Sequence, residues 1–196
     1  MALRLTVLTA LSVLLTVNHA RAQGYVAPSL GATFANPSAE GRANFGADLG
    51  WLSSREPIGL ELDIMHAPSF FGNQGAYGRN SVTTVMGNIV IAGGQTGGRR
   101  SRFSRRSPTA AVRPYVSGGI GIMHEAVTDG ASRLANNDLG VNLGVGVMAF
   151  TSRSFGVRGD VRYFRDLVNN QNGNTTGIDF GAFHFWRVGI GAVFAF

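Results

Sequence analysis

The sequence FHFWRVGIGAVFAF, residues 183–196, decides the fold of this chain. Every second side chain, counted back from the end, is apolar, and the series has aromatic residues near both ends: Phe196, Phe194, Ala192, Ile190, Val188 and Trp186. The positions between them, from Ala195 back to Arg187, carry small side chains and one charge. Because successive side chains of a strand point to opposite faces, the pattern predicts a strand with one continuous apolar face. A membrane barrel turns such a face to lipid, and we expect that arrangement rather than a water-soluble sheet.

Seven earlier segments show the same alternation, and turn-rich stretches separate them. The eight expected strands cover residues 25–34, 44–52, 58–66, 82–92, 112–126, 139–150, 155–167 and 183–196. Segments of about ten residues cross a bilayer when they are tilted. No stretch after residue 22 reaches the roughly 18 apolar residues that a membrane helix needs. The sequence therefore predicts an all-β fold, an eight-stranded antiparallel up-and-down transmembrane β-barrel.

The even number of strands puts both ends of the barrel chain on one side of the membrane, and we expect that side to be the periplasm. The connections expected outside the cell are residues 35–43, 67–80, 127–138 and 168–181. The connections 53–57 and 151–154 are short, as periplasmic turns usually are. Residues 93–111 do not fit this rule, because they form a long connection on the side that should have short ones.

Two motifs resemble the OmpA/OmpX-like family of small bacterial outer-membrane barrels. One is the chain end, where Gly191, Phe194 and Phe196 match the family's terminal strand; the family usually has a polar residue at the position of Gly189. The other is RPYVSGGIG at residues 113–121. The resemblance implies an outer-membrane barrel surrounded by lipid. It also implies that Gly191, Phe194 and Phe196 form a signal for the barrel assembly machinery.

The amino terminus has the features of a secretory signal peptide. Arg4 precedes an apolar run over residues 5–17, and Ala20 and Ala22 supply the small residues of a cleavage site. We therefore expect a signal peptide over residues 1–22 and a barrel domain over residues 23–196, exported through the general secretory route to the bacterial outer membrane. The chain has no cysteine, which excludes disulfides and thiolate metal sites.

Most of the net charge of +6 is concentrated in one segment. Two of the 17 basic residues lie in the expected signal peptide, and the five basic residues of one cluster are Arg99, Arg100, Arg102, Arg105 and Arg106. The other 10 basic residues stand against 11 acidic ones. A nucleic-acid-binding fold would spread basic residues over a face, so we expect no nucleic-acid partner. The cluster is either a solvated connection or a contact for anionic headgroups or an anionic periplasmic partner.

Charged residues recur at inward positions of the expected strands: Asp48, Glu61, Asp63, Glu125, Arg158, Asp160, Arg162 and Arg187. Buried charges must be paired or hydrated, and an eight-stranded barrel is only wide enough for side chains to fill it. We therefore predict an ion-pair network that plugs the lumen. A narrow pore for ions or small solutes is the main alternative, and carboxylates that perform acid–base chemistry are a third.

The sequence offers little support for an enzyme, a metal or a cofactor. His66, His124 and His184 fall at strand ends without metal-ligand spacing, and none is part of the His-x-Ser motif of lipid A deacylases. Gly50 and Trp51 leave a soluble lipocalin-like carrier as a weaker alternative. We predict a non-enzymatic barrel without a cofactor. We expect it to act as a monomer, with a structural or surface-interaction role through its external loops.

Overall fold

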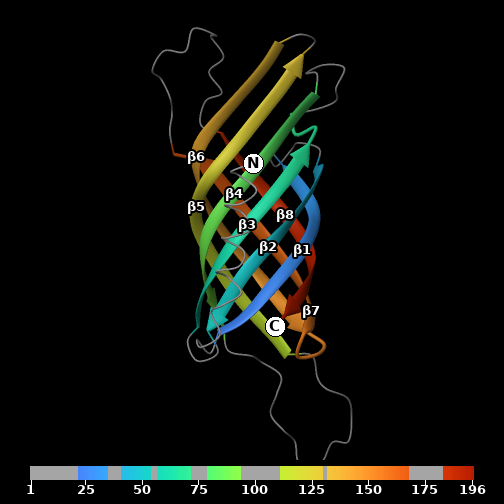
Figure 1. The fold of residues 1–196 in the computed structure, drawn as a ribbon, viewed down its shortest axis with the longest axis vertical. Coiled ribbons are helices and arrows are strands. Elements are labelled where there is room, and N and C mark those ends of the chain that lie inside the picture. Colours follow the sequence, from blue (N-terminus) through green and yellow to red (C-terminus); the bar gives the residue numbers. More distant parts are fainter. Residues whose placement is uncertain are drawn as a thin grey trace, which may run out of the picture.

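The computed structural model describes residues 22–34, 41–53, 57–71, 79–93, 111–129, 132–167 and 183–196. These residues form a closed antiparallel barrel of eight strands (Figure 1). The strands are β1 (Ala22–Phe34), β2 (Arg42–Ser53), β3 (Ile58–Pro68), β4 (Arg79–Ala92), β5 (Ala111–Asp129), β6 (Ser132–Phe150), β7 (Phe155–Asp166) and β8 (His184–Ala195). Each strand pairs with the next one in sequence, and β8 pairs with β1. The predicted fold class is confirmed.

Within the described part of the chain, no helix is long and apolar enough to cross a membrane.

The outward face of the barrel is apolar, as the alternation of the sequence predicts. β3 shows this most clearly, because its side chains are exposed and buried in turn from Ile58 to Met65. Large apolar side chains stay exposed on the outside, with Leu143 at 68% and Ile190 at 72% of their surface accessible. An apolar surface that continues around a barrel is typical of a lipid-facing wall.

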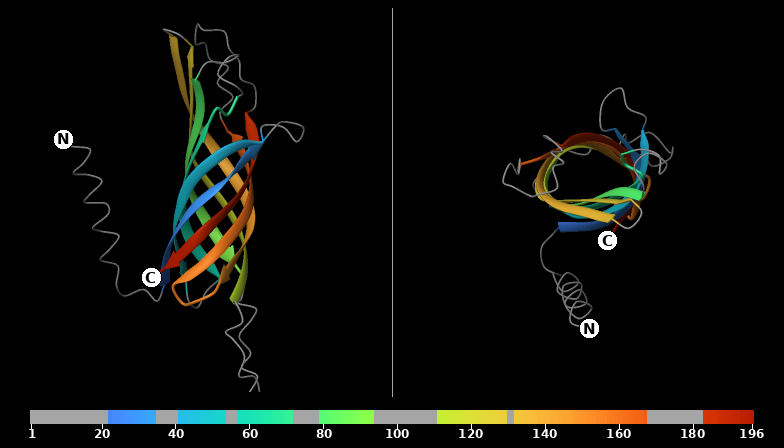
Figure 2. Two further views of the ribbon diagram at one scale, coloured as in Figure 1. Left: turned by 90° about the vertical axis from the view of Figure 1, so that its right-hand side faces the viewer. Right: turned by 90° about the horizontal axis from the view of Figure 1, so that it is seen from above.

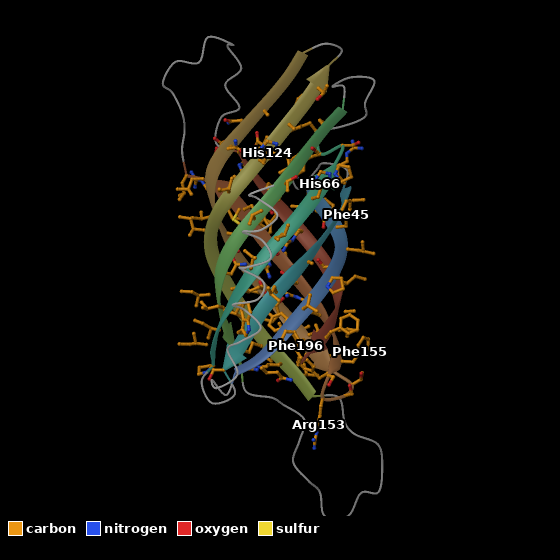
Figure 3. The ribbon with its side chains drawn as sticks, in the orientation of Figure 1. Phe45, His66, His124, Arg153, Phe155 and Phe196 are labelled. Atoms are coloured by element: carbon orange, nitrogen blue, oxygen red, sulfur yellow. The ribbon has the colours of Figure 1, made fainter. Side chains whose placement is uncertain are left out.

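Aromatic side chains lie on the outward face near both ends of the barrel. Tyr163 and Trp186 contact each other near one end, with ring centroids 5.0 Å apart. Phe155 and Phe194 contact each other near the other end, with ring centroids 5.5 Å apart. Figure 3 shows Phe155 and Phe196 together at the end where the chain terminates. Two such girdles mark the two interfaces of a membrane-spanning barrel.

The hairpin of β5 and β6 is longer than the sequence predicts. Residues 127–138 were expected to form a loop, but β5 continues to Asp129 and β6 begins at Ser132, so that each strand has 19 residues. The backbone ladder is unbroken up to the pair of Asp129 and Ser132. This part of the hairpin rises above the rest of the wall (Figures 1 and 2), where no lipid requires an apolar face. Its polar sequence therefore lacks the alternation on which the prediction depended.

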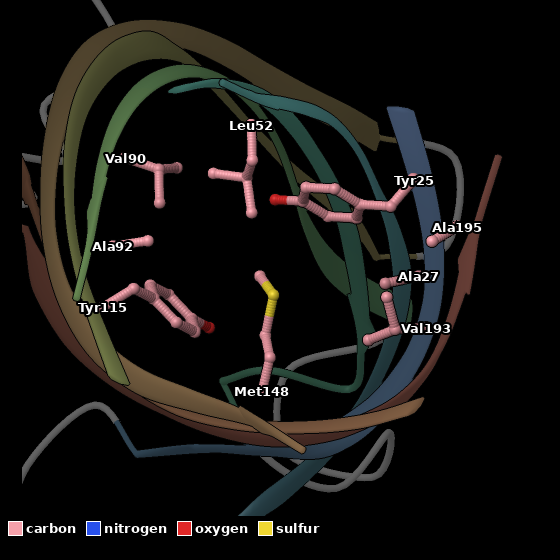
Figure 4. Packing of buried hydrophobic residues seen from close by; sticks show 9 residues of the cluster. All are labelled: Tyr25, Ala27, Leu52, Val90, Ala92, Tyr115, Met148, Val193 and Ala195. Atoms are coloured by element: carbon pink, nitrogen blue, oxygen red, sulfur yellow. The ribbon is translucent and has the colours of Figure 1, made fainter. Parts of the chain in front are cut away.

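The inward side chains fill the lumen in three layers. An outer apolar layer consists of Met65, Ala67, Phe70, Val82, Met86, Met123, Phe164, Phe183 and Phe185. A second apolar layer, at the end of the barrel where the chain terminates, consists of Tyr25, Ala27, Leu52, Val90, Ala92, Tyr115, Met148, Val193 and Ala195 (Figure 4). A charged layer lies between them, and its residues form the candidate functional site.

Candidate functional site

The charged layer is built by strands from two sides of the barrel. β2 supplies Asp48, β3 supplies Glu61 and Asp63, β7 supplies Arg158, Asp160 and Arg162, and β8 supplies Arg187. All seven side chains are buried. The carboxylates of β2 and β3 thus face the guanidinium groups of β7 and β8 across the lumen. Seven of the eight residues that the sequence assigns to a lumen network come together in this layer.

Arg162 is the centre of the charged layer. Its side chain is fully buried and lies near all four carboxylates. Nη2 is 2.6 Å from Glu61 Oε1 and 3.6 Å from Asp48 Oδ1. Nη1 is 3.3 Å from Asp63 Oδ2, and Nε is 3.5 Å from Asp160 Oδ1. The space for this long side chain comes partly from Gly144, where a Cβ atom would lie 2.7 Å from Arg162 Cγ.

Arg158 links the charged layer to the second apolar layer. Nη1 donates to Glu61 Oε2 at 2.8 Å and lies 3.1 Å from Asp48 Oδ2. Nη2 donates to Asp160 Oδ2 at 2.9 Å and to the hydroxyl of Tyr115 at 2.6 Å. The hydrogen bonds to Glu61, Asp160 and Tyr115 are assisted by the charge of the guanidinium group, which makes them stronger than hydrogen bonds between neutral groups.

Arg187 binds Asp63 with both of its terminal nitrogens. Nη1 donates to Asp63 Oδ1 at 2.9 Å, and Nη2 donates to Asp63 Oδ2. The guanidinium carbon also lies 5.2 Å from the ring centroid of Phe164, which belongs to the outer apolar layer. This bidentate geometry fixes the orientation of both side chains across the barrel.

Neutral polar side chains complete the layer, and the sequence analysis missed their role. The hydroxyl of Tyr25 donates to Glu61 Oε2 at 2.6 Å, and that of Tyr115 donates to Asp160 Oδ2 at 3.0 Å. Asn88 donates to Glu61 Oε1 at 3.4 Å, and Asn142 donates to Asn88 Oδ1 at 2.7 Å. All four fall at inward positions of the alternating pattern, so the sequence contains the signal that identifies them, although the predicted network comprised charged residues alone.

Carboxylate oxygens of Asp48, Glu61 and Asp63 lie within 4.8 Å of one another, which is close enough to hold a metal ion. Guanidinium groups of Arg158, Arg162 and Arg187 already occupy the space around these oxygens. The arrangement therefore serves charge pairing, and the apolar layers on both sides separate it from water. Neither feature favours proton transfer to a substrate.

Glu125 is not part of the network, and its assignment to the lumen ion pairs was wrong. Neither of its carboxylate oxygens has a hydrogen-bond partner. It lies on β5 two residues beyond Met123, which belongs to the outer apolar layer. The alternation of the sequence correctly predicts that Glu125 points inward, and its side chain is buried. The alternation does not specify the height of a residue along the barrel axis, and this height separates Glu125 from the arginines.

The chain end closes the wall of the barrel. Phe194 and Phe196 are exposed on the outward face, while Gly191 lies beside Arg158, whose Cγ would be 3.4 Å from a Cβ atom at that position. The backbone groups of Phe196 and Gly24 donate to each other at 2.9 and 3.1 Å. The arginine cluster, with Arg99, Arg100, Arg102, Arg105 and Arg106, lies outside the described residues.

The three histidines in the described part of the chain, His66, His124 and His184, lie toward the outer end of the barrel, and Figure 3 labels two of them. The Nδ1 atom of His66 lies 2.8 Å from Thr83 Oγ1, and that of His124 lies 2.7 Å from Asn137 Oδ1. The ring of His184 lies 6.1 Å from that of Tyr163. Among the described residues, the histidines are on separate strands and do not form a metal-binding group.

The comparison with protein families agrees with this architecture. The model of the outer membrane protein beta-barrel domain matches residues 5–194. The chain belongs to this family. The protein is therefore an integral β-barrel of the bacterial outer membrane, in contact with lipid. A search of curated proteins gave no match.

Solved structures with the same fold share little sequence with the chain. Neisserial surface protein A has 11% identity and a TM-score of 0.60, with 89% of this chain and 97% of that chain covered. A major outer membrane protein from Thermus thermophilus has 16% identity and a TM-score of 0.52, with 88% and 99% covered. The N-terminal β-barrel domain of Pseudomonas aeruginosa OprF has 15% identity and a TM-score of 0.50, with 88% and 97% covered. Identities this low show a common fold alone.

Proposed function

We propose that this protein is a non-enzymatic, non-conducting outer-membrane barrel that contributes to the structure of the envelope and interacts with partners at the cell surface. The observation that supports a closed barrel is the lumen filled by a charged layer between two apolar layers. A pore needs a continuous hydrated path, whereas the buried guanidinium groups of Arg158, Arg162 and Arg187 occupy the centre of the barrel. Charges that are paired in this way stabilise one arrangement of the wall.

The projecting part of the β5–β6 hairpin supports a role at the cell surface. The outward apolar face of β5 ends at Ile122, and the strand continues for seven residues to Asp129, roughly 20 Å along its length. β6 pairs with β7 only from Gly140 onward. Among the described residues, 132–138 thus have a strand partner on one edge only. An edge with free backbone groups can pair with an extended segment of another protein.

The remaining assignments are part of the same proposal. A signal peptide over residues 1–22 would direct export through the general secretory route. Gly191, Phe194 and Phe196 would form the signal for the barrel assembly machinery. The basic cluster 99–106 would contact anionic headgroups or a periplasmic partner. The barrel would function as a monomer, because each strand has two partners within the closed wall. It would need no cofactor for a structural role.

Conductance in planar bilayers tests the closed lumen. We expect the parent protein to give at most brief, small openings. The narrow-pore alternative requires stable channels, and such channels in the parent protein would reject the closed lumen. The control is a preparation that shows the shift in gel mobility of a folded barrel before and after boiling, so that an absence of current cannot come from unfolded protein.

Shortening the hairpin tests the surface role. Residues 127–134 can be replaced by a tight Asn-Gly turn, since Ala126 and Ala135 face each other in the ladder. We expect the shortened protein to reach the outer membrane at the parent level and to reduce adhesion of the producing cells to protein-coated surfaces. A matched variant with Asn137→Ala alters the hairpin without shortening it. Equal adhesion of the parent and shortened proteins would exclude the hairpin as the contact surface.

A further inference from the structure

A groove crosses the outside of the barrel wall, from β2 over β1, β8 and β7 to β6. Short outward side chains form its floor, namely Pro28, Ala149 and Ala192. One side of the groove is a ridge that contains Leu30 and Ile190, which face each other in the strand register and are 66% and 72% accessible. The groove has a volume of about 880 Å³, and sites for small ligands usually have roughly 300–1,000 Å³. It is therefore large enough for an apolar chain.

Gly159 makes a gap in this ridge. In the strand register it lies on the outward face between Ile190 of β8 and Val147 of β6. A Cβ atom on Gly159 would meet only Gly189 O, at 3.8 Å. The wall thus has room for a side chain at this position, and the lack of one leaves the groove open between β8 and β6.

Aromatic side chains form the opposite ridge. Phe194 lies between Val26 of β1 and Phe155 of β7 in the register, and the ring centroids of Phe194 and Phe155 are 5.5 Å apart. Figure 3 shows Phe155 at the end of the barrel where the chain terminates. Because aromatic side chains collect at membrane interfaces, this ridge marks the boundary between acyl chains and headgroups. The groove therefore begins next to the headgroup layer.

Arg153 lies in the turn beyond the aromatic ridge. The turn joins β6 to β7, and a cross-strand pair that lines the groove, Ala149 and Val157, lies four residues to each side of Arg153. Val157 and Phe155 are two residues apart, which is roughly 7 Å along a strand. Figure 3 shows Arg153 past Phe155, beyond the end of the wall. A lipid with a chain in the groove would therefore have its headgroup near Arg153.

The backbone of this turn is fixed, whereas the side chain of Arg153 is exposed. Ala195 N donates to Ser154 O at 2.9 Å, and Gln23 Nε2 donates to Arg153 O at 3.3 Å. In the part of the chain that the structure describes, the guanidinium group of Arg153 has no ion-pair or hydrogen-bond partner. A guanidinium group matches the geometry of phosphate and can donate two parallel hydrogen bonds to it. Arg153 is thus available to an anionic headgroup.

We propose that the groove is a binding site for one anionic phospholipid, with an acyl chain in the groove and the phosphate group on Arg153. In a bilayer every outward residue meets acyl chains, so a specific site needs complementary shape and charge. The groove supplies the shape, through close packing around the chain, and Arg153 supplies the charge.

The bound lipid belongs to the leaflet at the end of the barrel where the chain terminates, which is the periplasmic leaflet in the expected orientation. It lies over the contact between β8 and β1 that closes the barrel. Because the site is on the outside of the wall, it does not depend on whether the lumen conducts.

Native mass spectrometry of the folded protein in a mild detergent tests the site by titration with phosphatidylglycerol and with zwitterionic phosphatidylcholine of the same chain length. We expect the parent protein to retain one phosphatidylglycerol molecule and to bind it about fivefold more tightly than phosphatidylcholine, as one basic residue near the membrane surface predicts. Arg153→Ala should remove this preference. Arg165→Ala, an exposed arginine near the other end of β7, is the matched control and should keep it.

A second pair of variants tests the groove. Gly159→Leu puts a side chain into the gap and should prevent retention of either lipid at the concentration at which half of the parent molecules carry one. Gly87→Leu is the matched control, because Gly87 points outward on β4 and a Cβ atom there would likewise meet only one atom, Ile120 O, at 3.8 Å. It should retain lipid as the parent does. Heat-modifiable gel mobility shows whether each variant is folded.

A parent protein that retains no lipid, or that takes up several without saturation at one, would overturn the proposal. Equal retention by the parent and Gly159→Leu would exclude the groove, and equal affinity of the parent for the two lipids would exclude the contact of Arg153 with an anionic headgroup. A lipid-free dimer of the parent that Gly159→Leu dissociates would also reject the lipid site, because a second copy of the chain would then occupy the groove.

Discussion

The ring of Phe196 covers Gly24 on the outside of the barrel, and the backbones of the two residues bond to each other. Phe196 N donates to Gly24 O at 2.9 Å, and Gly24 N donates to Phe196 O at 3.1 Å. A Cβ atom on Gly24 would lie 2.5 Å from Phe196 Cε2. The last residue of the chain thus closes the seam between β8 and β1, in addition to its proposed role in assembly.

The first prediction separates these two roles of Phe196. Deletion of Phe196 removes the two backbone bonds and the ring, and we expect a lower level in the outer membrane, measured by cell fractionation and immunoblotting. Phe196→Leu keeps the backbone bonds and removes only the aromatic ring. If the assembly machinery recognises the ring, Phe196→Leu should lower the level in cells while the refolded protein unfolds at nearly the parent urea concentration. Unchanged levels of the deletion variant would contradict the assembly signal.

The second prediction concerns the lipid-facing wall. Leu62 is an outward residue in the middle of β3, whereas Ile58 begins the same strand on the same face. Leu62→Arg should cost roughly 2–4 kcal/mol because an arginine near the bilayer midplane is poorly solvated, and Ile58→Arg near the interface should cost at most about 1 kcal/mol. Unfolding in liposomes with guanidinium chloride measures both. Equal midpoints for the two variants would mean that the lipid-facing band is placed wrongly.

The third prediction concerns the close approach of β4 and β5. A Cβ atom on Gly119 would lie 2.2 Å from the carbonyl oxygen of Gly87 and 2.1 Å from Asn88 Oδ1, so the backbone itself is in the way. The outward Gly118 has more room, with 3.6 Å to the nearest atom. Gly119→Ala should destabilise the barrel by about 1–3 kcal/mol through overpacking, and Gly118→Ala should be close to neutral. Chemical unfolding in liposomes compares the two, and a neutral Gly119→Ala would show that the strands can separate at this point.

The sequence predicts the inward and outward faces of all eight strands because lipid imposes a strict period of two on the wall. The alternation does not determine how far neighbouring strands are shifted along each other. Glu125 and Glu61 both occupy inward positions, yet only Glu61 lies at the height of the arginines. The hydrogen bond from Tyr25 to Glu61 likewise depends on a register that spans three strands and cannot be read from one of them.

The part of the fold outside the membrane was the least predictable. In β5 and β6 the ladder from Ala126 to Ala135 and beyond is held by backbone hydrogen bonds, which leave little trace in the side-chain pattern. Apolar alternation is selected where lipid meets the wall and is not required above it.

The last prediction tests the charged layer as a unit. Arg162 contacts four carboxylates, so Arg162→Met should leave uncompensated buried charge and cost about 3–5 kcal/mol. Arg165→Ala, an exposed arginine three residues further along β7, is the matched control and should change stability by at most about 0.5 kcal/mol.

The bidentate pair of Arg187 and Asp63 allows a sharper form of the same experiment. Each single variant, Arg187→Met or Asp63→Leu, leaves one buried charge without its main partner, whereas the double variant removes both charges. We therefore expect the double variant to be more stable than the sum of the two single losses predicts, because buried pairs are costly to break and often cheap to replace. Urea unfolding in liposomes gives the three free energies. Planar-bilayer recordings of Arg187→Ala add a second measurement, since a lumen that loses this side chain should admit water and conduct more than the parent. Additive losses together with unchanged conductance would mean that the pair neither couples the two sides of the barrel nor closes the lumen.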